Sequence, residues 1–306
     1  LILITYEMAQ GNPILVTLGG GIFILPFLLF SALGGELADR LEKAYWIRRL
    51  KQLEIGIMLL AGSGFLLNSL VLLFIALFLM GAQSALMSPI KFALLPQHQP
   101  RERLVGANGL LEAGMFLATL AGTIAGTLLI PLAGGPQITT TVLLGLALVG
   151  YVASRFIPSA AIGDPELQLD LRPWTAIARV MGTARAYREV FLAMLGIGWF
   201  YLLGATFLAQ FPNFAKTIFN ANHQVVTLFL TTFSIGIAIG SLACHRLLRG
   251  EISLRFLPWA AFAMAVFAVD LFFASRALGP VAPTALAGLL EFLAHPGAWR
   301  VLLDLT

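Results

Sequence analysis

Charged residues are scarce in this sequence. Asp, Glu, Lys and Arg make up only 11% of its 306 residues, whereas a soluble domain carries roughly 25%. Hydrophobic residues account for 59%, and the mean hydropathy is +0.90. So few charges cannot cover the surface of a soluble globule of this size, and we expect lipid to surround much of the chain. The net charge of +4 is then better explained by basic loops beside a membrane than by a nucleic-acid partner.

The sequence also lacks the residues on which several enzyme classes depend. Its single cysteine, Cys244, excludes internal disulfides and a cysteine-rich metal site. None of the 4 histidines has an Asp five residues later, as glycerolipid acyltransferases require, and no lysine follows a glycine, as a phosphate-binding loop requires. A Gly-x-Ser-x-Gly elbow and zinc-spaced His or Cys pairs are missing too. We therefore expect no catalytic site, cofactor or metal in this chain.

Long apolar runs are present instead. A helix crosses the hydrocarbon core with about 20 residues, so the uncharged runs 55–90 and 113–154 are each too long for one crossing. Breaks are predicted at residues 68–69 (Asn-Ser) and 134–136 (Gly-Gly-Pro). The result is an all-α membrane protein with eight whole spans, near 13–34, 48–67, 69–91, 104–131, 137–157, 189–212, 224–248 and 255–275. Residues 1–7 and 298–306 are predicted to belong to two further, partial spans.

The basic residues indicate which side of the membrane each loop faces. Of the 19 Lys and Arg residues, only Lys216, Arg276 and Arg300 fall in loops on one side of this arrangement, and the other sixteen fall on the opposite side. Cytoplasmic loops carry the excess of Lys and Arg in membrane proteins. The sixteen therefore mark the cytoplasmic side.

The longest polar stretch, 158–188, predicts a division into two parts. It contains three prolines and acidic residues among its arginines, and we interpret it as a cytoplasmic linker. It separates an N-terminal helix bundle at 1–157, whose first span is incomplete, from a truncated C-terminal bundle at 189–306. This is the layout of a six-plus-six transporter.

Three motifs carry a family resemblance. Residues 34–40 read Gly-Gly-Glu-Leu-Ala-Asp-Arg and are followed by basic residues; this resembles the signature loop between the second and third spans of the major facilitator superfamily. Residues 88–96 (Ser-Pro-Ile-Lys-Phe-Ala-Leu-Leu-Pro) and 105–113 (Val-Gly-Ala-Asn-Gly-Leu-Leu-Glu-Ala) resemble the LplT-type lysophospholipid transporters. The pattern at 37–54 is similar to the branch of that family that is fused to an acyltransferase and an acyl-ACP synthetase.

The resemblance implies a major facilitator fold and a specific cargo. Such a carrier would move lysophospholipids, for example lysophosphatidylethanolamine, across the bacterial inner membrane by alternating access. Its partners would be the lipid substrate, the bilayer and an acyltransferase or acyl-ACP synthetase, fused or associated, and not nucleic acid. Two alternatives stay open: a drug or small-solute exporter of the same fold, and a membrane anchor that transports nothing.

The signature loop predicts a gate. Glycine allows close helix approach, and an Asp can cap a helix or pair with an Arg. In this interpretation Gly35, Asp39, Arg40 and Arg48 form a latch that exists in one conformation of the carrier. The alternative is a stop-transfer loop with ordinary charges. The corresponding residues of the second half, 240–246, lack the Asp, so a latch there would be weaker.

Ionisable and polar residues within spans are costly and are candidates for the substrate site. Lys91, between two prolines, could hold a lipid phosphate, or it could extend to the cytoplasmic interface. Glu112 shares a helix face with Asn108 and could pair with Lys91 or with a lipid ammonium, or form a structural interhelix pair. Gln83 and Gln210 are cavity candidates that could equally join neighbouring helices.

Overall fold

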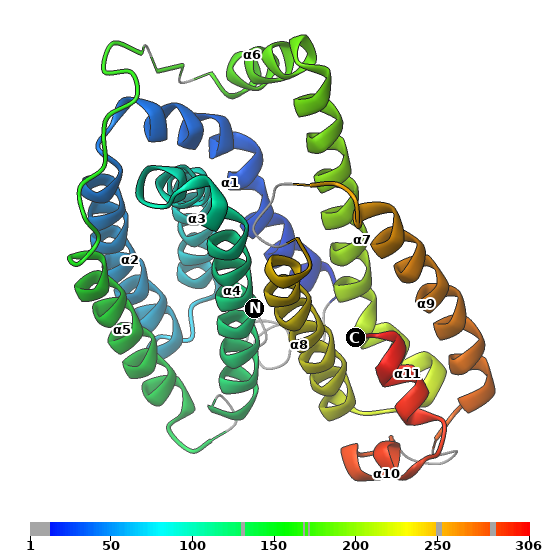
Figure 1. Cartoon of the computed structure of the whole chain (residues 1–306). Coiled ribbons are helices and arrows are strands. Elements are labelled where there is room, and N and C mark those ends of the chain that lie inside the picture. The colour runs from blue at the N-terminus through cyan, green and yellow to red at the C-terminus, as the bar shows by residue number, and fades with distance from the viewer. Residues whose placement is uncertain (1–12, 130–131, 168, 171, 249–252, 282–285) are drawn as a thin grey trace. The chain divides into compact units, whose positions relative to one another are not determined.

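The computed structural model describes residues 13–129, 132–167, 169–170, 172–248, 253–281 and 286–306. These residues form a helical protein (Figure 1), with an isolated parallel bridge between Ala221 and Ala287. The helices are α1 (Pro13–Arg40), α2 (Lys43–Leu66), α3 (Leu70–His98), α4 (Arg101–Leu129), α5 (Gly135–Ser154), α6 (Pro173–Ala186), α7 (Arg188–Phe219), α8 (His223–Leu248), α9 (Leu257–Leu278), α10 (Leu289–Ala294) and α11 (Ala298–Asp304).

Seven helices in the described part of the chain are long and apolar enough to cross a membrane: α1, α3, α4, α5, α7, α8 and α9. They coincide with seven of the eight predicted spans. The remaining predicted span, 48–67, falls in α2, whose first half carries five charged residues. Of the two partial spans, 1–7 lies outside the described residues, and 298–306 contains the short helix α11.

Both predicted breaks between spans are present, and local chemistry explains them. α2 ends at Leu66, Asn68 adopts a left-handed conformation with φ 49°, and the hydroxyl of Ser69 accepts a hydrogen bond from Leu72 N to begin α3. Gly134 has φ 76°, which glycine adopts without a steric penalty, and α5 begins directly after it. Each of the two long apolar runs is thus divided between two helices, α2 and α3 in the first run and α4 and α5 in the second.

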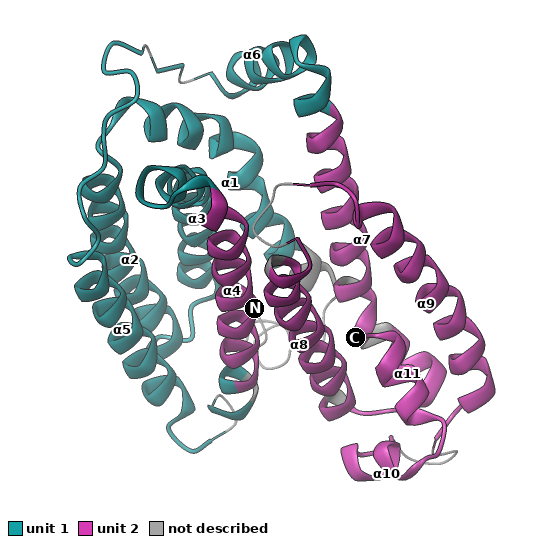
Figure 2. Ribbon diagram, viewed as in Figure 1, with its two compact units in different colours: residues 1–101, 125–191 teal, residues 102–124, 192–306 magenta. Residues whose placement is uncertain are grey.

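The chain forms two compact units (Figure 2). Unit 1 comprises residues 1–101 and 125–191, and unit 2 comprises 102–124 and 192–306. In unit 1, α3 packs against α1 and α2, and α2 packs against α5. Two apolar clusters fill these contacts. One is built around Ile57 and Ala147, and the other joins Ala38, Ile47 and Ile90.

The core of unit 2 is aromatic. Phe211, Phe219, Phe229 and Phe292 are almost completely buried and meet edge to face, with ring centroids 5.5–6.0 Å apart. They bring α7, α8 and α10 together. The predicted bundles at 1–157 and 189–306, joined by a linker, stay a prediction.

Candidate functional site

The predicted gating loop begins with a close approach of two helices. A Cβ added at Gly34 would lie 2.9 Å from the carbonyl oxygen of Ala85 and 3.1 Å from the Cα of Leu86 in α3. Real Cβ atoms do not approach backbone atoms this closely, so only glycine fits there. A Cβ at the predicted site residue Gly35 would meet nothing within 4 Å among the described residues. Gly34, one position earlier, therefore supplies the close contact.

The Glu42 carboxylate joins the start of α2 to the segment that follows α5. Its carboxylate accepts hydrogen bonds from Ala44 N at 3.0 Å, Tyr45 N at 2.6 Å and Ala160 N at 2.8 Å. Burial raises the pKa of Glu42, but these three amides and nearby Arg48 outweigh it, so the pKa lies below its usual value. One carboxylate thus caps a helix and holds the linker segment that begins near residue 158.

The other predicted gating residues contact the same segment, mainly through the backbone. The carbonyl oxygen of Asp39 accepts hydrogen bonds from Gly163 N and Asp164 N at 3.0 and 2.9 Å, while the Asp39 side chain is exposed. Arg48 donates to the carbonyl oxygen of Ile157 at 2.9 Å. Arg40 ends α1 and is partly exposed. Asp39 and Arg48 therefore both bind 157–164, and a latch formed by the Asp39 side chain stays a prediction.

A buried lysine adds a further contact to the linker. Lys43 is only 3% exposed, and its ammonium donates to the carbonyl oxygen of Ala161 at 3.4 Å. The amide of Gln97, in α3, donates to the same oxygen at 3.2 Å. The start of the linker is thus held by side chains from α2 and α3.

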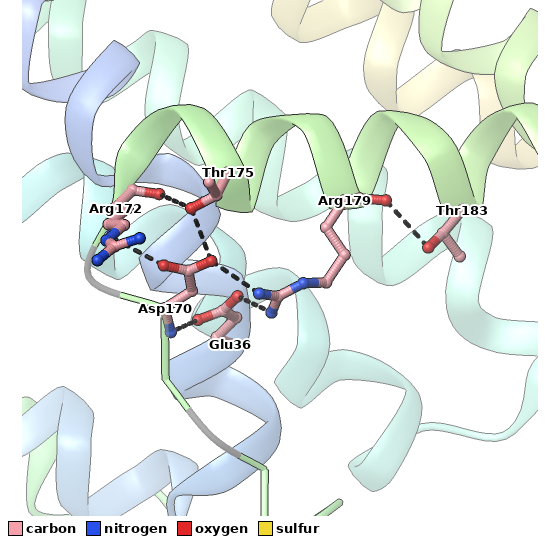
Figure 3. A network of polar contacts seen from close by, with 6 residues as sticks. All are labelled: Glu36, Asp170, Arg172, Thr175, Arg179 and Thr183. Carbon is pink, nitrogen blue, oxygen red and sulfur yellow. Dashed lines mark hydrogen bonds and ion pairs between the residues drawn. The ribbon is translucent and has the colours of Figure 1, made fainter.

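The polar network centred on Glu36 was not predicted (Figure 3). Glu36 is 9% exposed; it accepts hydrogen bonds from Arg179 Nη1 at 3.1 Å and from Asp170 N at 2.8 Å. Arg179 also forms an ion pair with Asp170 at 2.7 Å. The sequence did contain a signal: Glu36 is the first charged residue after an uncharged run, and apolar Leu37 and Ala38 follow it.

Hydrogen bonding stabilises the charged form of Asp170 in this network. The Thr175 hydroxyl donates to its carboxylate at 2.7 Å, and Arg172 N donates at 3.0 Å. These two bonds, with Arg179 and Arg172 nearby, hold the pKa of Asp170 below its usual value despite partial burial. Asp170 and Glu36 share Arg179, which fastens α6 to the end of α1.

Two predicted substrate residues lie in unit 1, on α3. Gln83 is 5% exposed and donates to the Glu54 carboxylate at 3.1 Å, and Glu54 is paired with Lys51 at 2.7 Å. Gln83 therefore joins α3 to α2. Lys91 is partly buried, with its ammonium 5.4 Å from the centroid of the Phe92 ring. Pro89 lies two residues before it, inside the helix.

The other predicted substrate residues lie in unit 2. Glu112 is partly buried in α4, and its carboxylate accepts a hydrogen bond from the Tyr201 hydroxyl of α7 at 3.5 Å. Asn108, one turn earlier on α4, is exposed, and so is Gln210 on α7. The predicted pairing of Glu112 with Lys91 stays a prediction.

An ion pair in unit 2 was also not predicted from the sequence. Arg300 of α11 binds Asp270 of α9 through two bonds, at 2.5 and 2.9 Å. The two residues are 30 positions apart, so spacing alone does not pair them. Groups of three or more His, Cys, Asp or Glu residues that could hold a metal were not found in the described ranges.

Comparison with known proteins identifies a matching family and several similar relatives. The family model described as "Major Facilitator Superfamily" matches residues 2–306. The chain is 28% identical over 243 residues to the lysophospholipid transporter LplT of Salmonella heidelberg (strain SL476) and to that of Salmonella agona (strain SL483). LplT of Salmonella gallinarum is 27% identical over 240 residues. Each alignment covers 78% of this chain and 58% of the relative, so the chain spans little more than half the length of these relatives. No solved structure matches.

Proposed function

Because the chain belongs to the major facilitator superfamily, we propose that this multi-pass membrane protein carries lysophospholipids across the bacterial inner membrane. The observation that supports this cargo is the similarity to LplT over 243 residues, 78% of the chain. The similarity agrees with the two motifs around Lys91 and Glu112. The carrier works by alternating access, with the helix bundles 1–157 and 189–306 exposing the substrate site to each side of the membrane in turn.

The gate lies at the cytoplasmic end of α1. There Gly34 brings α1 against α3, and Glu36, Asp39 and Glu42 bind the segment that follows α5. These contacts are short-range and polar, so a small movement of α1 breaks several of them together. They form in one conformation of the carrier and separate in the other.

Lys91 and Glu112 are the two charged candidates for headgroup binding, one in each unit. Lys91 attracts the lipid phosphate, because a partly buried ammonium interacts more strongly with an anion than one in bulk water. Glu112 attracts the ammonium of an ethanolamine headgroup, and the Tyr201 hydroxyl orients its carboxylate. Asn108 shares the face of Glu112 and adds a hydrogen bond. Gln83 has a structural role, since Glu54 already binds its amide.

Uptake of labelled lysophosphatidylethanolamine by spheroplasts tests this proposal. We expect Lys91→Ala to reduce uptake at least about tenfold, since a charge-assisted contact to the phosphate contributes on the order of 1.5–3 kcal/mol. Lys91→Arg keeps the positive charge and should retain most of the activity. Immunoblots of the membrane fraction check that both variants are expressed equally.

Two outcomes contradict the proposal in different ways. Normal uptake by Lys91→Ala would remove Lys91 from the headgroup site. If uptake is absent with the unaltered protein, the chain is an anchor or an exporter of other solutes. Competition by drugs but not by lysophospholipids would identify the exporter.

A further inference from the structure

Helix α6 differs from the helices that can cross the membrane. It has 14 residues, which at 1.5 Å per residue gives about 21 Å, too short to cross the hydrocarbon core. It lies outside the seven membrane-capable helices. In unit 1 it packs against α1 and runs across the direction of α2 and α5 (Figure 1). A helix that runs across the spanning helices at the end of a span has the direction of one that lies along a membrane surface.

An apolar stripe runs along α6. Ile177, Val180, Met181 and Ala184 follow the i, i+3, i+4, i+7 spacing of one helix face. Ala184 is buried, but Val180 is 46% exposed. Trp174 at the start of the helix and Tyr187 just after it are each 65% exposed. The protein itself therefore covers the stripe only in part, and an aromatic side chain of the type that favours membrane interfaces lies at each end.

The charged residues of the α6 segment itself have one sign. Residues 171–188 contain four arginines and no Asp or Glu. Arg179 is occupied by Glu36 and Asp170, which fixes how the helix is oriented on α1. The other three arginines, Arg172, Arg185 and Arg188, are exposed. An exposed cationic rim around a partly uncovered apolar stripe is complementary to an anionic lipid surface.

We propose that α6 is an interfacial helix that binds anionic phospholipid headgroups of the cytoplasmic leaflet. Trp174 and Val180 enter the headgroup region, and Arg172, Arg185 and Arg188 contact lipid phosphates. Because Arg179 ties α6 to Glu36 in α1, lipid binding stabilises the position of α6 next to the predicted gate. The proposal concerns the membrane, not the transported substrate, and stands independently of the cargo.

The single cysteine makes this surface accessible to site-directed labelling. In a Cys244→Ser background, a spin label is placed at Val180→Cys on the stripe or, as a matched control, at Ala178→Cys, which is exposed on the other side of the helix. The protein is reconstituted in nanodiscs of phosphatidylcholine alone or with about one third phosphatidylglycerol. Accessibility to oxygen and to a water-soluble nickel chelate reports whether each label lies in lipid or in water.

We expect the label at 180, but not that at 178, to be shielded from nickel in the discs with phosphatidylglycerol. The shielding should weaken in pure phosphatidylcholine. It should also weaken when Arg172, Arg185 and Arg188 are replaced by Gln, because each arginine contributes about fivefold to binding at an anionic surface. Equal water exposure of both labels in every disc overturns the proposal. Shielding of the label at 180 from oxygen as well as from nickel also overturns it, because protein would then cover the stripe.

Discussion

Two segments at corresponding places in the two halves of the sequence, 34–40 and 240–246, have different environments. The first contains Glu36, 9% exposed, and the corresponding residue of the second is Leu242, 49% exposed. Leu37 and Ala38 are buried, whereas Cys244 is exposed. Both segments end a long apolar helix, so hydropathy alone does not separate them.

The difference shows what a buried carboxylate adds to a loop of this kind. Glu36 cannot lie near the protein interior without partners, and Arg179 and Asp170 N provide them. Satisfying that one charge brings α6 and the preceding linker residues onto the end of α1. A leucine at the corresponding position has no such requirement. We therefore expect the first segment to contribute more to gating than the second.

The largest effect should come from the glycine that begins each segment. Gly34→Ala places a methyl group against the backbone of α3, and such overpacking costs about 1–3 kcal/mol. At Gly240 the added Cβ would meet nothing within 4 Å in the part of α8 and its surroundings that is described, so Gly240→Ala should stabilise α8 by up to about 1 kcal/mol. Thermal unfolding of both variants in detergent measures the difference. Equal midpoints would contradict the close contact of α1 with α3.

A smaller effect is expected from the arginine that neutralises Glu36. Arg179→Ala leaves that carboxylate with only the Asp170 amide, which should cost about 1–2 kcal/mol because a nearly buried charge loses its partner. Limited proteolysis between residues 158 and 172 should become faster. A control change in the second half, Arg246→Ala, removes an exposed arginine and should alter stability by less than about 0.5 kcal/mol.

A second substitution separates charge burial from a general loss of packing. Adding Glu36→Gln to Arg179→Ala removes the unpaired charge but keeps the side-chain size. If the network acts through that charge, the double variant should recover part of the lost stability. A double variant less stable than Arg179→Ala would show that Arg179 acts through packing alone.

The smallest effect concerns pH and Glu42. Because its folded pKa lies below the ordinary value of 4.5, the unfolded chain binds the proton more readily, and the stabilisation is present above about pH 4.5 and is lost as the pH falls through the folded pKa. A charged cap of this kind contributes about 0.5–1 kcal/mol. Glu42→Gln should therefore lower the unfolding midpoint at pH 7 and flatten its decline in acid. If the unfolding midpoint of Glu42→Gln falls with acid as steeply as that of the unaltered protein, Glu42 does not control the loss of stability in acid.

Much of the fold could be predicted because lipid imposes a simple requirement. Backbone groups in hydrocarbon must bond within their own segment, so long apolar runs become helices. The breaks before Leu70 and at Gly134 follow from residues with strong local preferences. The roles of Gln83 and Glu36 were harder to predict, because their partners Glu54 and Arg179 lie on other helices, 29 and 143 residues away.

The sequence by itself determined that this protein has apolar helices with basic loops on one side and that it resembles a lipid carrier, because composition and local motifs carry that information. Only the tertiary structure decided which glycine touches α3, which carboxylate is buried, and that the linker is bound along the end of α1. Those features depend on contacts between distant segments, and a side chain acquires such a contact only after the helices have packed.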